Sequence, residues 1–178
     1  MQIYLIRHTT PEVAKGICYG QTDLNLTSNF DNEASSVLEK IPKNIDLVFS
    51  SPLTRCLRLA QRIKTNVIID ERLKELDFGS WEMKFWDEIP QEEIKPWYND
   101  WVNVSASKYG ESYSELYVRS IEFMQYLKKE YKSSKKIAIV THAGVIRAIN
   151  AYVKKIDLKD SFNLKLNYGS TINFSINS

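Results

Sequence analysis

The chain has 178 residues, with 24 basic and 22 acidic side chains and a formal net charge of +2. So balanced a charge argues against nucleic acid as a partner, and no apolar run approaches the ~18 residues that cross a membrane. The length and the 43% share of hydrophobic residues fit a single domain over residues 1–178 that is large enough to bury a core.

The first residues contain no basic stretch followed by an apolar one, so we expect a cytoplasmic protein rather than a secreted one. Cys18 and Cys56 are the only cysteines, and we predict free thiols in a reducing compartment. The two histidines and two cysteines lie far apart in the sequence, a pattern that offers no cluster of metal ligands.

The first predicted element is a strand over Ile3–Ile6, an apolar run that ends on Arg7 and His8. In open α/β sheets the carboxyl ends of the strands form the ligand crevice, so this pair lies where binding residues are expected. A solvated strand end is the alternative, and it would be preferred for a lone histidine. Residues 9–26 then form a long loop, and loops of this length are often functional.

Four later segments repeat apolar residues at helical spacing, and short apolar runs separate them. The first predicted helix is 27–41, beginning at Thr27 or Ser28, with Asp31 in its first turn, and stopped by Pro42. The second has its apolar repeat over 53–63, and Pro52 suits its first turn. The other two are 113–131 and 145–153. The predicted strands after the first are 46–51, 67–69, 137–141, 164–168 and 171–176.

This alternation predicts an α/β fold, a three-layer α/β/α sandwich with a mostly parallel sheet whose last two strands run antiparallel at an edge. Residues 81–113 differ in composition, because all four tryptophans lie there with several acidic residues. We interpret this segment as a small helical insertion over one end of the sheet.

Polar groups follow three of the predicted strands. Arg7 and His8 end the first strand, Arg55 lies just beyond the second, and His142 ends the fourth, followed by Gly144 at a helix start. Together they form an anion site, because arginine forks match phosphate oxygens and backbone N–H groups at a helix start add to them. The charge suits a phosphoryl group better than a carboxylate. Alone, Arg55 could be a surface arginine, and Arg7 could form an ion pair at the sheet edge.

Six segments of the chain carry recognisable motifs: Leu5–Thr9, Asp23–Thr27, Ser50–Arg55, Leu73–Glu82, Gly110–Ser112 and Thr141–Arg147. They cover nearly the whole chain. In these motifs and in their order, the chain resembles the histidine phosphatase superfamily, also called phosphoglycerate-mutase-like.

The resemblance implies a metal-independent phosphatase without a cofactor, in which His8 attacks phosphorus and becomes a phosphohistidine. It implies that Arg7, Arg55 and His142 hold the phosphoryl oxygens. Glu75 would protonate the leaving oxygen and then activate water. Without the motif, Glu75 would be taken for a solvated loop acid. Glu82 is expected to cap or pair locally.

Further phosphate contacts are implied at Ala143, Gly20, Gln21 and Thr22. The chain departs from the family pattern in two places near the nucleophile. Thr9 replaces a glycine, and Ala14 replaces an asparagine whose role Lys15 or Thr10 would have to take.

Extra segments that hold a bisphosphorylated cofactor have little room in this chain, so hydrolysis is favoured over mutase action. The segments Arg7–Pro11 and Cys18–Asp23 are most similar to the α-ribazole phosphatase branch, which acts in cobalamin biosynthesis. The expected partner is a small phosphorylated metabolite, and the tryptophans would either stack on its aromatic base or pack the insertion onto the sheet. The alternatives are a phosphoglycerate mutase, a broad sugar-phosphate phosphatase, and a non-catalytic protein that binds a phosphorylated ligand. The oligomeric state is open, a homodimer included.

Overall fold

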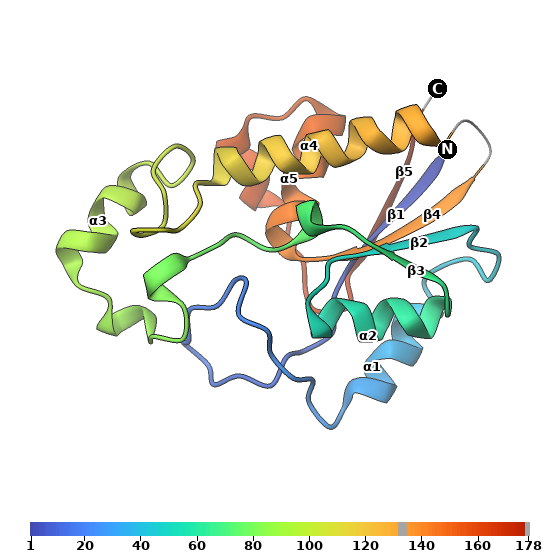
Figure 1. Cartoon of the computed structure of the whole chain (residues 1–178), viewed down its shortest axis with the longest axis horizontal. Helices are drawn as coiled ribbons and strands as arrows, with labels where there is room; N and C mark the ends of the chain where they lie inside the picture. The colour runs from blue at the N-terminus through green and yellow to red at the C-terminus, as the bar shows by residue number, and fades with distance from the viewer. Residues whose placement is uncertain (132–134, 177–178) are drawn as a thin grey trace.

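A central five-stranded sheet organises the protein, for which a computed structural model describes residues 1–131 and 135–176 (Figure 1). The strand order is β3-β2-β4-β1-β5. Parallel pairing joins the first four strands, and β5 runs antiparallel to β1 at one edge. The strands are β1 (Gln2–Arg7), β2 (Leu47–Ser50), β3 (Val67–Ile69), β4 (Lys136–Thr141) and β5 (Thr171–Ser175).

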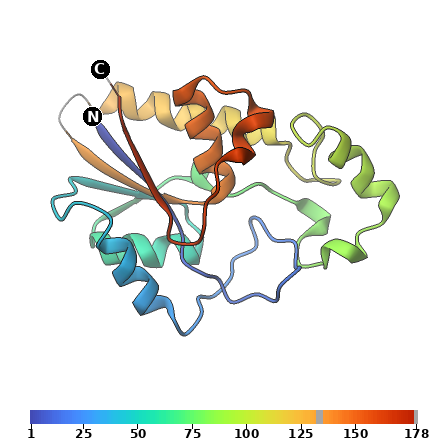
Figure 2. The same cartoon turned by 180° about the vertical axis from the view of Figure 1, so that it is seen from behind.

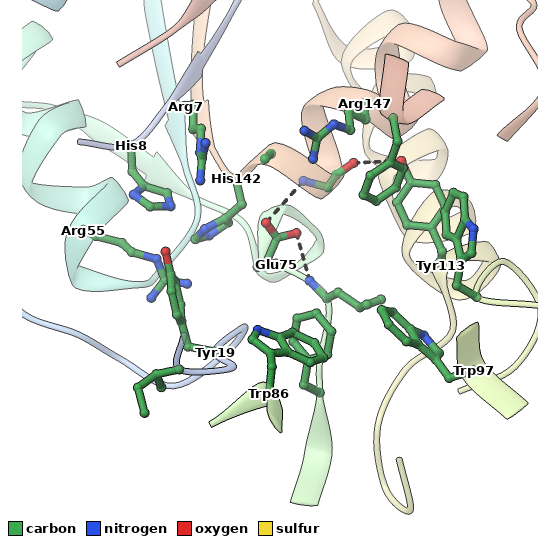
Figure 3. Close-up of a pocket in the computed structure, with 17 residues that line it drawn as sticks. Arg7, His8, Tyr19, Arg55, Glu75, Trp86, Trp97, Tyr113, His142 and Arg147 are labelled. Carbon is green, nitrogen blue, oxygen red and sulfur yellow. Dashed lines mark hydrogen bonds between the residues drawn. The ribbon is translucent and has the colours of Figure 1, made fainter. Parts of the chain in front are cut away.

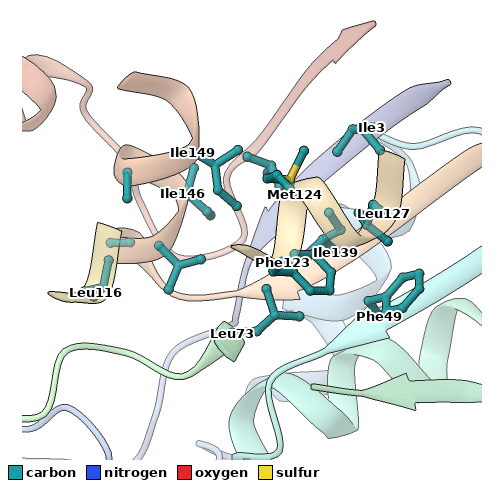
Figure 4. Packing of buried hydrophobic residues seen from close by; sticks show 14 of the residues in the cluster. Ile3, Phe49, Leu73, Leu116, Phe123, Met124, Leu127, Ile139, Ile146 and Ile149 are labelled. Carbon is teal, nitrogen blue, oxygen red and sulfur yellow. The ribbon is translucent and has the colours of Figure 1, made fainter. Parts of the chain in front are cut away.

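Helices cover both faces of this sheet, as Figures 1 and 2 show from opposite sides. Alternate residues of a strand point to opposite faces. Accordingly, Ile3 and Leu5 of β1 lie in one hydrophobic core, and Tyr4 and Ile6 lie in another. The first core packs against α4 (Tyr113–Glu130) and α5 (Ala143–Lys154), as Figure 4 shows, and the second against α1 (Phe30–Leu38) and α2 (Thr54–Ile63). The predicted three-layer sandwich is confirmed.

The insertion after residue 80 forms its own small body beyond the end of the sheet where β1 and β4 terminate (Figure 1). It contains a 3-10 turn, Trp86–Glu88, and α3 (Gln91–Asn99). Trp81 is 1% exposed at the centre of a separate hydrophobic cluster. This tryptophan is therefore structural.

Helix starts differ in detail from the sequence prediction. The first helix begins at Phe30 with Asn29 as its N-cap, so the prediction of Thr27 or Ser28 is wrong, although Asp31 does lie in the first turn. It ends at Leu38, four residues before Pro42, so the proline does not stop it.

The start of α2 has a physical reason that local sequence does not contain. Pro52 lies outside the helix, which begins at Thr54. The Asp23 carboxylate, from the long loop, accepts hydrogen bonds from the Thr54 N–H at 2.7 Å and the Thr54 hydroxyl at 2.6 Å. An acidic group at a helix N-terminus is stabilising, so a distant residue sets where this helix begins.

The predicted strand 164–168 is wrong. A 3-10 segment, Leu158–Asn163, precedes an irregular turn there. The edge of β1 is occupied by β5 instead. Two arginine side chains donate hydrogen bonds to carbonyl groups of this turn. Arg7 Nη1 donates to Leu166 O at 2.7 Å, and Arg147 Nε donates to Leu164 O at 3.2 Å. In the two described stretches of chain, no helix is both long and apolar enough to cross a bilayer.

Candidate active site

The five predicted catalytic residues line one pocket with a cavity volume of about 340 Å³ (Figure 3). Arg7 ends β1 and His8 follows it, Arg55 lies in the first turn of α2, and His142 is the N-cap of α5. Glu75 lies in a loop after the 3-10 turn Glu71–Leu73. Because β1, β2 and β4 are parallel, the residues that follow them meet at one edge of the sheet.

His8 is held as a neutral imidazole. Its ring is 2% exposed, and Nδ1 lies 2.7 Å from the Thr9 carbonyl oxygen. A carbonyl only accepts hydrogen bonds, so Nδ1 carries the proton and Nε2 keeps its lone pair. Burial, followed by the charge of Arg55, holds the pKa of His8 well below its usual value, with a smaller contribution from Arg7. This ring is suited to nucleophilic attack.

His142 is also buried and neutral. The centroids of the His142 and His8 rings are 5.1 Å apart in an edge-to-face arrangement. Burial lowers the pKa of His142 most, with further contributions from Arg55 and His8. Its Nε2 lies 2.9 Å from Ser51 Oγ and 3.4 Å from Cys56 Sγ. These contacts from the end of β2 and from α2 fix the ring beside the pocket.

The hydrogen-bond donors of Arg7 and Arg55 are only partly paired with acceptors in the described part of the protein. Arg55 Nη1 donates to Thr22 O at 2.9 Å, and its Nη2 donates to Gly20 O. Within residues 1–131 and 135–176, the Nε atoms of Arg7 and Arg55 are buried and have no hydrogen-bond partner. Buried donors without a partner are rare, so these two guanidinium groups form an anion site that a phosphoryl group would complete.

Two tyrosines border this anion site, and the sequence analysis did not select either one. The Arg7 Cζ lies 4.1 Å from the ring centroid of Tyr168, and the Arg55 Cζ lies 5.5 Å from that of Tyr19. The hydroxyl groups of Tyr19 and Tyr168 are 2.7 Å apart. Tyr19 directly precedes the segment Gly20–Thr22, which was predicted to contact phosphate. This position in the sequence was the only indication that Tyr19 belongs to the site. Tyr168 lay in the wrongly predicted strand.

Glu75 is held against the start of α5. Its Oε2 accepts from the Gly144 N–H at 3.2 Å, and its Oε1 accepts from the Leu76 N–H at 3.0 Å. A Cβ at position 144 would overlap Glu75 Oε1, so glycine is what permits this approach. The Gly144 N–H, predicted to be free for an anion, is therefore taken by Glu75.

Of the three loop residues predicted to contact phosphate, Gly20 and Thr22 bind Arg55, and Gln21 binds Glu82. The carbonyl groups of Gly20 and Thr22 accept from Arg55, and the N–H groups of Gln21 and Thr22 donate to the Glu82 carboxylate. None of the three is among the described residues that line the pocket. The local pairing expected of Glu82 is only part of its role: it accepts from the nearby Phe78 N–H at 3.3 Å, but its contacts with Gln21 and Thr22 span 61 and 60 positions of the sequence. Their direct phosphate contacts stay a prediction.

Three other predicted positions can be placed. Ala143 lines the pocket. Lys15 is exposed and the Thr10 N–H donates to Glu33 Oε2 at 2.8 Å, so neither side chain belongs to the pocket wall in the described structure. Thr9, in place of the family glycine, supplies the carbonyl that orients His8.

The side of the pocket away from His8 is aromatic, with one cation (Figure 3). The Trp86 and Trp97 rings stack at 5.9 Å with an interplanar angle of 19°. Arg147 was missed as a site residue, although it lies one helical turn after Gly144 on the same face of α5. The aromatic residues on this wall are Phe78, Trp86, Trp97, Trp101, Tyr113 and Phe162.

Comparison with known proteins gives concordant matches. The family model of the histidine phosphatase superfamily (branch 1) matches residues 3–178. The chain is 26% identical to an adenosylcobalamin/alpha-ribazole phosphatase of Escherichia coli over 186 residues, covering 99% of this chain and 91% of that protein.

Two solved structures share the fold over nearly the whole chain. The alpha-ribazole phosphatase from Shigella flexneri has a TM-score of 0.89 and 27% identity, covering 99% of this chain and 91% of that one. A mutant phosphoserine phosphatase from Entamoeba histolytica, in complex with phosphoserine, has a TM-score of 0.84 and 26% identity, covering 98% and 90%. The predicted resemblance to this family, its α-ribazole phosphatases included, is confirmed.

Proposed function

Because the chain belongs to the histidine phosphatase superfamily (branch 1), we propose that it hydrolyses phosphomonoesters through a phosphohistidine formed on His8. The observation that carries this proposal is the buried His8 ring. Its Nδ1 is bonded to a backbone carbonyl, and its Nε2 lone pair is available beside two arginines with unpaired buried donors in the described structure.

In the first step, His8 Nε2 attacks phosphorus as the bond from phosphorus to the ester oxygen breaks. Glu75 gives its proton to the leaving oxygen, so the product leaves as a neutral alcohol. Water then attacks the phosphohistidine while the Glu75 carboxylate takes a proton from it. The phosphorus–nitrogen bond breaks, its electron pair returns to Nε2, and inorganic phosphate is released. Arg7, Arg55 and His142 stabilise the phosphoryl oxygens in both steps.

The incubation of p-nitrophenyl phosphate with the protein and with His8→Ala tests this function. We expect release of p-nitrophenol by the protein and none above background by the variant. Equal release by both would refute a role of His8 as nucleophile. No release by either, with phosphate still bound, would instead support the non-catalytic alternative.

For the substrate, we propose α-ribazole 5'-phosphate, an intermediate of cobalamin biosynthesis. Its planar aromatic base suits the stacked Trp86 and Trp97 rings, because offset stacking of aromatic rings is stabilising. In the described structure, Trp97 Nε1 is a buried donor without a partner, so an acceptor atom on the leaving group would pair it. The similarity to α-ribazole phosphatases supports the same choice.

A second candidate substrate is O-phosphoserine, and one observation favours it. Arg147 is a pocket cation whose pKa is lowered chiefly by burial. No carboxylate in the described part of the chain lies within 4.0 Å of its nitrogens. A carboxylate on the leaving group would pair with it.

A panel of α-ribazole 5'-phosphate, O-phosphoserine, 3-phosphoglycerate and glucose 6-phosphate separates these candidates. We expect the highest kcat/KM with α-ribazole 5'-phosphate, and Trp86→Ala should lower that value by about tenfold through lost stacking. Tyr98→Ala is the matched control, because Tyr98 is 58% exposed on the same insertion. A preference for O-phosphoserine that Arg147→Met abolishes would favour the second candidate. Transfer to a second hydroxyl of 3-phosphoglycerate would favour the mutase.

A further inference from the structure

Arg119 of α4 holds the backbone of the loop that carries Glu75. Its Nη1 donates to the carbonyls of Arg72 at 2.7 Å and Lys74 at 2.6 Å, and its Nη2 donates to the carbonyl of Glu75 at 2.9 Å. Its Nε and Nη2 also bind the two carboxylate oxygens of Glu111, at 2.6 and 2.8 Å. The Arg119 and Glu111 side chains are only 18% and 15% exposed. One guanidinium thus joins three carbonyls and a carboxylate.

The loop depends on such side chains because it belongs to no helix or strand between the 3-10 turns Glu71–Leu73 and Gly79–Trp81. Buried backbone carbonyls need donors. Thr141 Oγ1 supplies one to Leu73 O at 2.6 Å, and Gln21 Nε2 shares the Glu75 carbonyl at 3.2 Å. Arg119 therefore donates to three of the four successive carbonyl groups of residues 72–75, and Thr141 donates to the fourth.

Arg119 acts from outside the substrate pocket. It lines a separate polar cleft together with Lys74 and Glu111, whereas Glu75 turns its carboxylate to the active-site pocket and the N–H of Gly144. The loop backbone lies between the two. Arg119 therefore has two routes to the chemistry: the position of Glu75, and a smaller effect of its charge on the pKa of His142.

We propose that Arg119, with Glu111 as its counter-charge, is a positioning residue that holds Glu75 where it can protonate the leaving oxygen. The inference rests on the proposed role of Glu75 as general acid. Without the guanidinium, the carbonyls of Arg72 and Lys74 would lose this donor, and the Glu75 carbonyl would keep only its contact with Gln21 Nε2. The Glu111 carboxylate would face them without its counter-charge. The loop would relax, and the Glu75 carboxylate would leave its place beside α5. Lysine cannot replace this frame, because its single ammonium lacks the fork of donors.

Leaving-group dependence tests the inference, since a merely structural role would not change it. p-Nitrophenolate leaves without a proton, whereas the alkoxide of β-glycerol phosphate needs one. We expect Arg119→Met to lower kcat/KM for β-glycerol phosphate by at least about tenfold, and for p-nitrophenyl phosphate by less than about threefold. The quantity kcat/KM excludes the later hydrolysis of the phosphohistidine, so it reports the step in which Glu75 acts as acid.

Three variants control this experiment. Glu75→Gln should show the same selective loss, and the double variant Glu75→Gln, Arg119→Met should show no further selectivity. Arg72→Met is the matched control, because Arg72 lies on the same loop and binds Asp70 at 2.6 Å, but its side chain holds none of these carbonyls. It should lower both kcat/KM values equally. Glu111→Gln keeps Arg119 in place and should give a smaller loss with the same selectivity, should Arg119→Met fold poorly.

Equal losses for both esters in Arg119→Met and in Glu111→Gln, with a selective loss in Glu75→Gln, would overturn the inference and leave the proposed function intact. Absence of selectivity in Glu75→Gln itself would instead refute the assigned role of Glu75, and the inference with it. A protein inactive on both esters would overturn the proposed function.

Discussion

Tyr19 and Tyr168 are 149 positions apart in the sequence, yet their hydroxyl groups share a hydrogen bond of 2.7 Å. Each ring also lies against one of the two arginines of the anion site. The pair therefore joins the long N-terminal loop to the turn before β5, and it restrains both guanidinium groups from the outside. In the proposed phosphate site, ring faces therefore hold the arginines as well as hydrogen bonds do.

The ring of Tyr168 should matter more than its hydroxyl. Loss of the cation–π contact with Arg7 in Tyr168→Leu is expected to weaken inhibition by inorganic phosphate by about fivefold, from about 1 kcal/mol of interaction. Tyr168→Phe keeps the ring and removes only the hydroxyl, so its inhibition constant should change by less than about threefold. Steady-state inhibition by phosphate measures both. Equal effects of the two variants would contradict this account.

Gly144→Ala should remove the general acid from its place. The added Cβ would overlap Glu75 Oε1, so the carboxylate must move and lose its bond to the start of α5. Turnover of an alkyl phosphate is expected to fall by at least about tenfold. Binding of inorganic phosphate, measured by calorimetry, should persist because Arg7, Arg55 and His8 are untouched. Unchanged turnover would show that Glu75 does not act from this position.

The two buried histidines predict how stability depends on pH. Their pKa values are lowered in the folded protein, chiefly by burial. Below about pH 6.5 the unfolded chain therefore binds protons that the folded chain does not. The free energy of unfolding should fall with decreasing pH in this window, by up to about 1.4 kcal/mol per pH unit for each histidine. Above about pH 6.5 neither histidine contributes to the pH dependence of the free energy of unfolding.

Urea unfolding at several pH values measures this slope. Below about pH 6.5, the free energy of unfolding of His8→Asn should depend less steeply on pH, because the variant lacks one of the two histidines that bind a proton on unfolding. Identical slopes in the protein and the variant would show that His8 is protonated in the folded state. Such a result would also weaken its assignment as a neutral nucleophile.

Removal of metal ions should leave activity unchanged. In the proposed mechanism the nucleophilic nitrogen comes from His8, and Arg7 and Arg55, which line the same pocket, supply the positive charge at the phosphoryl oxygens. We expect the same kcat with p-nitrophenyl phosphate before and after dialysis against EDTA. Activity that disappeared on dialysis and returned with added Mg²⁺ or Zn²⁺ would refute metal-independent hydrolysis.

The sequence was most informative where function and fold coincide. Strand ends followed by Arg7, Arg55 and His142 were predictable because apolar runs are short and end abruptly on polar residues. The parallel sheet then places them together without further information. Motif resemblance supplied Glu75, whose loop has no periodicity that would single it out.

Features that depend on distant side chains were not predictable. The start of α2 depends on Asp23, and the loop of Glu75 depends on Arg119. The segment 164–168 has the composition of a strand, but its carbonyls are taken by Arg7 and Arg147. Local sequence cannot show which distant side chain will donate a hydrogen bond to a backbone carbonyl. Tyr168 lies in this segment and was missed for the same reason.

The parallel pairing of β1 with β4 also governs when the site can exist. Residues 2–7 must pair with residues 136–141 before His8 and His142 come together. During synthesis His8 therefore cannot meet His142 until β4 has been made. Closing so long a loop is a slow entropic step in folding. A nascent chain that stops short of β4 leaves β1 unpaired, because both of its partner strands, β4 and β5, come later in the sequence.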